Sequence, residues 1–200
     1  MQYFRWSQFG GEEENEHILV WFLSIQLNSI TEWDLMTGKY INDWDKNTTA
    51  TYEEEVEYTD YPFTTGLLPV YSTRLKALMD NLGIEWIQYL PLTVKKHNLS
   101  KEIEGYFIAN YLKVIDCLNR ERSSYQVWTK ENLLFWEKRE YMLGTFRDVK
   151  KIVLDTNKIN NAKIFRLWGW ELAVIIREDL KREIEKAKIT GCVFTPVEML

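Results

Sequence analysis

The sequence predicts an α+β fold in which mixed or antiparallel sheets are combined with a few helices, and three observations lead to this prediction. A strand–helix–strand pattern occurs twice, at about residues 70–94 and 175–199. The 200 residues are 46% hydrophobic, which is enough to bury a substantial core. No Gly-, Pro- or Ser-rich linker occurs between residues 95 and 170. We therefore expect one continuous body, with a β-rich acidic part at residues 1–64 and an α+β part at residues 65–200.

The first part is predicted to consist mainly of strands and turns. His17–Leu27 is rich in β-branched and aromatic residues, which favours a largely buried strand. A turn is expected at Met36–Lys39, where a glycine follows a threonine. Tyr52–Tyr58 alternates imperfectly between aromatic and acidic residues, so we expect an edge strand whose glutamates discourage further pairing.

The repeated pattern aligns when the chain is shifted by 105 residues. Leu75 and Met79 in the first copy, and Leu180 and Ile184 in the second, recur at helical spacing and predict one buried face in each helix. The identical pairs are Leu75 and Leu180, Lys76 and Lys181, Ile84 and Ile189, and Pro91 and Pro196. We expect two equivalent structural units.

The ends of these units also carry signals. Ser72 or Thr73 can cap the first helix, and Gly83 supplies the left-handed residue that ends it. A short strand is expected after each helix. Pro91 and Pro196 follow these strands and are expected to close them, because proline cannot donate a ladder hydrogen bond.

The segment between the copies predicts further strands and one helix. Gly105–Leu118 is apolar and indicates one strand, or two strands with a kink near Asn110. Lys130–Arg139 is compatible with a helix that begins after Thr129. Two more strands are expected at Lys151–Leu154 and Lys163–Trp168, with a turn at residues 157–161 between them.

Charge is distributed unevenly along the chain. The total is 30 acidic against 25 basic residues, a net charge of −5, which argues against nucleic acid or an anionic membrane as the main partner. Residues 1–65 nevertheless carry 13 acidic and only 3 basic side chains. This acidic part is either a solvated surface or a docking surface for a basic partner. The acidic residues proposed for docking are Glu53, Glu54, Glu55, Glu57, Asp43 and Asp45.

Motifs for catalysis, cofactors or metals do not appear in the sequence. The nine glycines form no phosphate-binding loop, and two cysteines with two histidines leave little material for a metal site. Cys117 and Cys192 lie in apolar stretches and are expected to be core residues. We therefore predict neither a catalytic site nor a cofactor. The longest strongly apolar run, Ile18–Leu23, is much shorter than the about 20 residues of a membrane span, so a cytoplasmic location is expected.

Aromatic residues make up 14% of the chain, including nine tryptophans. Most of these rings are expected in the core, but tryptophan is also a frequent anchor at protein interfaces. Trp44 lies within the acidic part, and Trp168 and Trp170 flank a glycine at a strand end. Trp44 is a candidate for contact with a partner, with core packing as the alternative. Trp168 and Trp170 are candidates for contact with a partner or for stacking on a sugar, with core packing of a hairpin as the alternative.

Short stretches in a fixed order carry a resemblance to a known family. They are Val70–Ser72 with Leu75, Gln88–Pro91, Gly105–Ile108, Ile115–Asp116, Ser123 or Ser124, Val153–Asp155, Ile164–Arg166, and Thr190–Gly191 through Pro196. In this order they resemble the Imm11 family, also known as DUF1629, over about two-thirds of the chain. Residues 1–64 match only as a variable β-rich lead-in.

The resemblance implies an immunity protein of a bacterial polymorphic toxin system. Such a protein binds and neutralises a cognate toxin in the cytoplasm, and no catalytic residues can be carried over from the family. From the acidic first part of the chain we expect the toxin to present a basic surface. The residues alone leave two other classes open. One is a carbohydrate- or small-ligand-binding module that uses surface aromatics, and the other is an enzyme with an unrecognised site. Nothing in the sequence predicts the oligomeric state.

Overall fold

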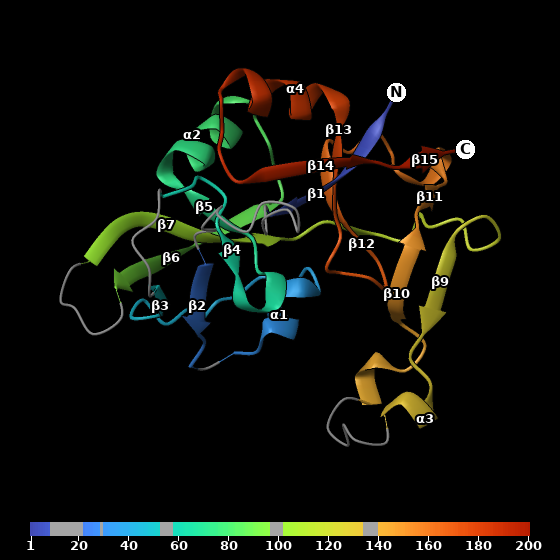
Figure 1. Ribbon diagram of the computed structural model, residues 1–200, viewed down its shortest axis with the longest axis horizontal. Helices are drawn as coiled ribbons and strands as arrows, with labels where there is room; N and C mark the ends of the chain where they lie inside the picture. The colour runs from blue at the N-terminus through green and yellow to red at the C-terminus, as the bar shows by residue number, and fades with distance from the viewer. Residues whose placement is uncertain (9–21, 29, 53–57, 97–101, 134–139) are drawn as a thin grey trace, which may run out of the picture.

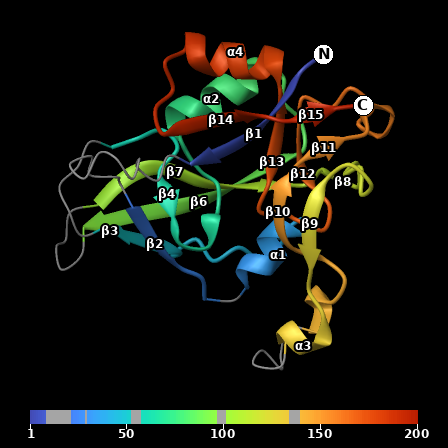
Figure 2. The same ribbon diagram turned by 45° about the vertical axis from the view of Figure 1, so that its right-hand side comes forward.

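The computed structural model describes residues 1–8, 22–28, 30–52, 58–96, 102–133 and 140–200, and it has the predicted α+β architecture. Two main sheets form the body, with short helices on their outer sides (Figure 1). A small two-stranded arm that carries a helix at its tip extends away from this body in both views (Figures 1 and 2).

The strands of the described residues form four sheets. The five-stranded sheet contains, in spatial order, β14 (Cys192–Pro196), β1 (Tyr3–Gln8), β13 (Val174–Arg177), β12 (Ile164–Leu167) and β8 (Val114–Ile115). The six-stranded sheet contains β4 (Phe63–Thr64), β2 (Phe22–Gln26), β3 (Thr49–Tyr52), β6 (Ile87–Lys96), β7 (Glu102–Tyr111) and β5 (Val70–Ser72). The arm pairs β9 (Ser124–Val127) with β10 (Phe146–Lys151), and β11 (Val153–Leu154) pairs with β15 (Glu198–Met199).

Short helices connect these strands. The α-helices of the described residues are α1 (Glu32–Met36), α2 (Thr73–Asn81), α3 (Lys130–Leu133) and α4 (Glu178–Lys186). Single 3₁₀ turns are η1 (Thr65–Leu67), η2 (Glu140–Met142) and η3 (Thr156–Lys158). None of the helices in the described ranges has the length and apolarity needed to cross a bilayer.

The two predicted strand–helix–strand units are confirmed as β5–α2–β6 and β13–α4–β14. In each unit a third strand separates the two parallel strands: β7 lies between β5 and β6, and β1 lies between β13 and β14. The third strand runs antiparallel to both neighbours in each case. Both copies therefore have the same split β-α-β topology. The strand β1 belongs to residues 1–64 in sequence but completes the unit at the end of the chain.

Helices α2 and α4 lie side by side and pack into the same core (Figures 1 and 2). Leu75 and Leu180 are at most 2% exposed, and their mates Met79 and Ile184 are fully buried in the same cluster. The predicted buried faces are therefore correct, and the two copies share one apolar interior. Trp6 of β1 is also 1% exposed within this cluster and accounts for part of the aromatic surplus.

The C-terminal ends of α2 and α4 are also equivalent, whereas their starts differ: only α2 has a side-chain cap. The predicted cap Ser72 accepts a hydrogen bond from the Leu75 amide. After α2, Gly83 adopts a φ of 62°, and its repeat mate Lys188 adopts a φ of 53° after α4. In each copy the next amide donates a hydrogen bond to a main-chain oxygen of the helix. The Ile84 amide donates to Met79, and the Ile189 amide donates to Ile184. The second copy achieves this backbone geometry without a glycine.

The prediction that Pro91 closes its strand is wrong. β6 continues to Lys96, and Pro91 lies opposite Phe107 within the ladder. Pairing of β6 with β3 begins only at Thr93, so no β3 partner requires an amide donor from position 91. Pro196, in contrast, is the last residue of β14, as predicted.

The remaining element predictions are confirmed in part. The Gly105–Leu118 stretch contains two strands, β7 and β8, and the break after Tyr111 agrees with the kink predicted near Asn110. Helix α3 begins after Thr129, whose hydroxyl accepts a hydrogen bond from the Asn132 amide. The expected edge strand at Tyr52–Tyr58 is wrong where it can be checked, because Tyr52 ends the interior strand β3. Residues 53–57 lie outside the described residues.

A buried aspartate connects the two repeat units. Asp60 is 8% exposed and accepts hydrogen bonds from the Ser72 hydroxyl at 2.6 Å and the Thr190 amide at 3.0 Å. The Arg74 guanidinium pairs with the same carboxylate at 2.9 Å. Ser72 and Arg74 belong to the first unit, and Thr190 follows the helix of the second. Asp60 therefore fixes the start of α2 against the end of α4.

Candidate functional site

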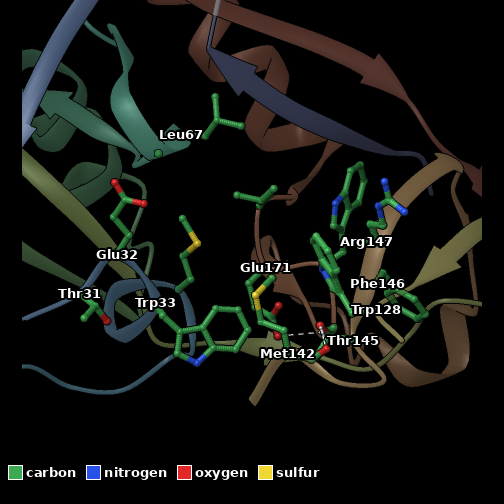
Figure 3. A pocket seen from close by; sticks show the side chains of 15 residues that line it. Thr31, Glu32, Trp33, Leu67, Trp128, Met142, Thr145, Phe146, Arg147 and Glu171 are labelled. Atoms are coloured by element: carbon green, nitrogen blue, oxygen red, sulfur yellow. Dashed lines mark hydrogen bonds between the residues drawn. The ribbon is translucent and has the colours of Figure 1, made fainter. Parts of the chain in front are cut away.

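A cleft of about 700 Å³ lies between the arm and the body (Figure 3). Its walls come from segments that are distant in sequence: α1 and η1 on one side, and residues of the β9–β10 arm on the other. The turn between β12 and β13 forms the floor. Trp33, Trp128 and Trp170 line the cleft, one from each of these three parts.

The α1 wall is fixed by a capping box. The Thr31 hydroxyl accepts a hydrogen bond from the Asp34 amide, and the Asp34 carboxylate accepts one from the Thr31 amide at 2.9 Å. Hydrogen bonds from Thr31 lower the pKa of Asp34, so the carboxylate stays ionised in the first turn of the helix. Leu35 is fully buried and anchors the helix, which leaves Trp33 and Met36 to line the cleft.

The η1 wall holds an exposed leucine in an unfavourable backbone conformation. Gly66 has a φ of 67° and Leu67 a φ of 55°, and the Leu67 residue is 42% exposed at the cleft. A Cβ on Gly66 would lie 2.4 Å from the Glu32 carboxylate, which would have to move aside, and the positive φ is what favours glycine here. A left-handed leucine costs about 1–2 kcal/mol, and such strain is concentrated at functional sites.

Main-chain hydrogen bonds order the arm wall, one within the arm and one from the arm to the floor. The Trp128 amide donates to Thr145 at 2.9 Å, and the Phe146 amide donates to Gly169 of the floor at 2.7 Å. The Arg147 guanidinium lies over the Trp128 ring at 5.5 Å from its centroid. These contacts fix Trp128 relative to the turn that carries Trp170.

A buried carboxylate lies in the floor. Glu171 is 7% exposed, and one of its oxygens accepts a hydrogen bond from the Gly169 amide at 2.9 Å. Gly169 has a φ of 81°, and a Cβ at this position would lie 3.1 Å from the Phe146 ring. Leu172, the next residue, is 44% exposed at the same cleft. The floor thus combines a fixed carboxylate with uncovered apolar surface.

The fully buried Arg166 supports this floor from behind. One of its terminal nitrogens donates to the main-chain oxygen of Glu171 and not to the carboxylate. Its guanidinium lies 5.2 Å from the centroid of the Tyr111 ring. Burial lowers the pKa of Arg166 below its ordinary value, and Coulomb interactions with Tyr111, Tyr61 and Glu171 act in the opposite direction. The arginine therefore holds the backbone of the turn at the cost of burying a charge.

The structure separates Trp168 from Trp170, although only Gly169 lies between them. Trp170 lines the cleft and packs partly against the core. Trp168 is 45% exposed outside this lining, with the Arg120 guanidinium 5.7 Å from its ring. Arg120 also forms an ion pair with Asp116 at 2.9 Å. The two rings therefore belong to different surfaces.

The acidic candidates of the first part also differ in their surroundings. The Trp44 indole donates to Pro91 at 2.9 Å and packs against the core of the six-stranded sheet. Asp45 accepts a hydrogen bond from the Asn28 side chain at 2.8 Å, and this bond lowers its pKa. Asp43 is exposed. Glu53, Glu54, Glu55 and Glu57 lie outside the described residues.

Sequence reasoning identified Trp170 but missed most of the cleft. Trp33 lies on a five-residue helix that is too short to show periodicity, and Trp128 lies at the end of a short strand. Leu67 gave one usable signal, because the preceding Gly66 marks a backbone that can become left-handed. Only the fold brings these positions together.

Cys117 is fully buried and Cys192 is partly buried, and both thiols are free. Burial raises the pKa of each to about 12, which is opposite to what a nucleophilic cysteine requires. Within the described parts of the chain, no group of three or more His, Cys, Asp and Glu side chains is arranged to hold a metal ion.

We expect both thiols to resist modification in the folded protein. With a pKa of about 12, only about one thiol in ten thousand is ionised at pH 8, and the pKa shift disappears on unfolding. Absorbance after addition of Ellman's reagent should therefore show reaction more than about a hundredfold slower without guanidinium chloride than with it. Equal rates in the two conditions would contradict the assigned burial.

Comparison with known proteins identifies one family. The model of the immunity protein family Imm11 matches residues 26–199, which include α1, η1, the arm and the floor of the cleft. No curated protein shows significant sequence similarity to this chain. The match covers most of the chain, and it includes both split β-α-β units except strand β1. The chain therefore belongs to the Imm11 immunity protein family.

Proposed function

We propose that this protein neutralises a cognate toxin of a bacterial polymorphic toxin system by direct and non-catalytic binding in the cytoplasm. Membership of the Imm11 immunity protein family supports an immunity role. An inhibitor of this kind needs a rigid body and a surface that matches one partner. The fold provides a body with two fused units and a preformed cleft beside the arm.

The observation that carries this proposal is the uncovered apolar surface of the cleft. Leu67 and Leu172 are 42% and 44% exposed at its edge, and three tryptophans lie below them. Exposed apolar groups that are gathered in one place are typical of interaction sites. Tryptophan is also the residue most enriched among the energetically dominant contacts of interfaces. A toxin domain that covers the cleft would remove this surface from water.

The experiment is a protection assay with the toxin domain encoded by the neighbouring gene. Cells that express the toxin domain should grow when this chain is co-expressed and stop growing without it. The purified chain should bind a catalytically inactive form of the toxin domain in a one-to-one complex, measured by isothermal titration calorimetry. Absence of both protection and binding would refute the proposal. Protection at substoichiometric amounts of the chain would refute the non-catalytic mechanism.

The acidic part is proposed to accelerate the encounter with a basic toxin surface. Changing Glu53, Glu54, Glu55 and Glu57 together to lysine should weaken the complex by about tenfold or more, mainly through a slower association rate. Surface plasmon resonance at low and high salt measures this, because screening should reduce the difference. An unchanged association rate at low salt would place the interface elsewhere. Asp43, Asp45 and Trp44 are the adjoining candidates.

The second candidate function is a carbohydrate- or small-ligand-binding module. The volume of about 700 Å³ and the three tryptophans favour this function, because both are usual in small-molecule sites. Titration with a panel of glycans, followed by tryptophan fluorescence, tests it. A saturable change with one glycan, without toxin protection, would support this alternative over the immunity mechanism.

A further inference from the structure

The charges of the cleft limit what kind of side chain it can accept. Glu171 is 7% exposed in the floor, and Glu32 stands at the η1 wall with its carboxylate against Gly66. Neither carboxylate forms an ion pair with a lysine or arginine among the residues that the structure describes. The cleft therefore contains two acceptors with capacity for a further donor.

Arg147 lines the cleft and Arg166 lies behind its floor, but neither forms an ion pair with these carboxylates, although Arg166 interacts electrostatically with Glu171 and its Nε and Nη2 form no hydrogen bond with the described residues. Arg166 donates to the main-chain oxygen of Glu171, and Arg147 stacks on Trp128. A purely apolar occupant would cover Glu171 and Glu32 and remove their water without replacing it. Such desolvation of a carboxylate is strongly unfavourable unless a cation compensates it. An occupant with a positive charge avoids this cost.

The tryptophans favour the same occupant. The aliphatic part of a lysine or arginine can lie along apolar rings while its charged end reaches a carboxylate. Tryptophan is the aromatic ring that attracts cations most strongly. Trp33, Trp128, Trp170 and Glu171 all line the cleft, so aromatic and carboxylate contacts are offered by one cavity. Figure 3 labels Trp33, Trp128 and Glu171.

We propose that the cleft is the docking site for a projecting basic segment of the cognate toxin. One lysine or arginine of that segment lies among the three tryptophans and pairs with Glu171 and Glu32, and neighbouring apolar side chains cover Leu67 and Leu172. This inference rests on the proposed function, and it specifies where the toxin binds and through which chemistry. The acidic part described above then acts on the rate of encounter, and the cleft determines the lifetime of the complex.

The first test measures toxin binding by variants that remove charge and keep shape. Glu171→Gln retains an oxygen that can accept from the Gly169 amide, so the floor should keep its backbone. The double variant Glu171→Gln and Glu32→Gln should bind the inactive toxin domain about tenfold to a hundredfold more weakly. Glu183→Gln on α4, outside the cleft, is the matched control and should bind like the wild type. Circular dichroism of every variant checks that the fold is retained.

The second test measures binding of a small basic ligand to the cleft in the absence of the toxin. N-acetyl-arginine amide should change the tryptophan fluorescence of the wild type in a saturable manner, and the uncharged analogue N-acetyl-citrulline amide should not. The double glutamine variant should lose the response to arginine. Trp33→Leu should also lose it, whereas Trp86→Leu, at a position that is 59% exposed away from the cleft, should keep it.

The outcomes separate the inference from the proposed function. Wild-type binding of the toxin together with unchanged binding by the double variant would overturn the docking site and leave the immunity role intact. Failure of the wild type both to bind the toxin domain and to protect would overturn the immunity role. A cleft that responds to citrulline as strongly as to arginine, or only to a glycan, would overturn the basic occupant in either case.

Discussion

Replacing Gly191 with alanine is expected to destabilise the protein by about 3 kcal/mol or more, because two penalties combine at this position. Gly191 has a φ of 82°, a backbone conformation that an L-residue adopts at a cost. A Cβ there would lie 2.4 Å from the main-chain oxygen of Tyr61 and 3.1 Å from the Thr59 side chain. A backbone oxygen cannot move aside in the way that the end of a flexible side chain can. The contact between Tyr61 and the segment after α4 would have to open.

Gly83→Ala is the matched control for this prediction. Gly83 also has a positive φ of 62°, but a Cβ there meets no atom within 4 Å. Its cost should be only the backbone penalty, about 1 kcal/mol. Urea unfolding of the wild type and the two variants gives the two free-energy differences. Equal losses for Gly83→Ala and Gly191→Ala would show that the close approach at Tyr61 contributes nothing.

Asp60→Ala is expected to reduce the free energy of unfolding by about 3 kcal/mol. The substitution leaves the Ser72 hydroxyl and the Thr190 amide without their acceptor, and it removes the connection between the two repeat units. Hydrogen bonds to a charged acceptor contribute more than neutral ones, and groups that stay buried without a partner add a desolvation cost. The loss should appear in urea unfolding monitored by circular dichroism.

Arg74→Ala separates the ion pair from the hydrogen bonds. The Arg74 side chain is 54% exposed, so water and salt screen its pairing with Asp60, and its removal should cost less than about 1 kcal/mol. In a double-mutant cycle the coupling of Asp60 to Ser72 should therefore exceed its coupling to Arg74. If Arg74→Ala reduces the free energy of unfolding as much as Asp60→Ala does, then the ion pair, and not the hydrogen bonds of Asp60, holds the two units together.

Patterns within single segments of the sequence predicted the helix faces and helix caps, because these depend only on residues that are close together in the chain. The spacing of Leu75 and Met79 gives the buried face of α2, and the same spacing at Leu180 and Ile184 gives that of α4. The family resemblance was also confirmed by the match over residues 26–199. Caps at Ser72 and Thr129 followed from the preference of hydroxyl side chains for helix starts.

Features that depend on pairing between distant segments were not predictable in this way. Nothing in residues 3–8 indicates that β1 lies between β13 and β14, because strand pairing leaves no mark in a single segment. Pro91 appeared to end a strand, since the absence of a β3 partner at that position is visible only in the sheet. Asp60 appeared to be one acid among many, and its burial depends on Thr190, which is 130 residues away.

The residues of the cleft were also hard to predict from the sequence, because they come from segments that are distant in the chain. Trp170 was selected because it stands beside Trp168 and Gly169, but the structure places only Trp170 in the cleft lining. Trp33 and Trp128 had no distinguishing neighbours in the sequence. The acidic segment Glu53–Glu57 remains a prediction, because it lies outside the described residues.

Fluorine NMR of the protein labelled with 5-fluorotryptophan tests the docking of the toxin in the cleft most directly. The nine tryptophans give separate probes in a chain that carries no substitution, and single Trp→Phe variants assign their signals. On addition of one equivalent of the inactive toxin domain, the signals of Trp33, Trp128 and Trp170 should shift or broaden, and the signal of Trp86 should stay in place. A bound complex in which these three signals do not change would show that the toxin binds elsewhere.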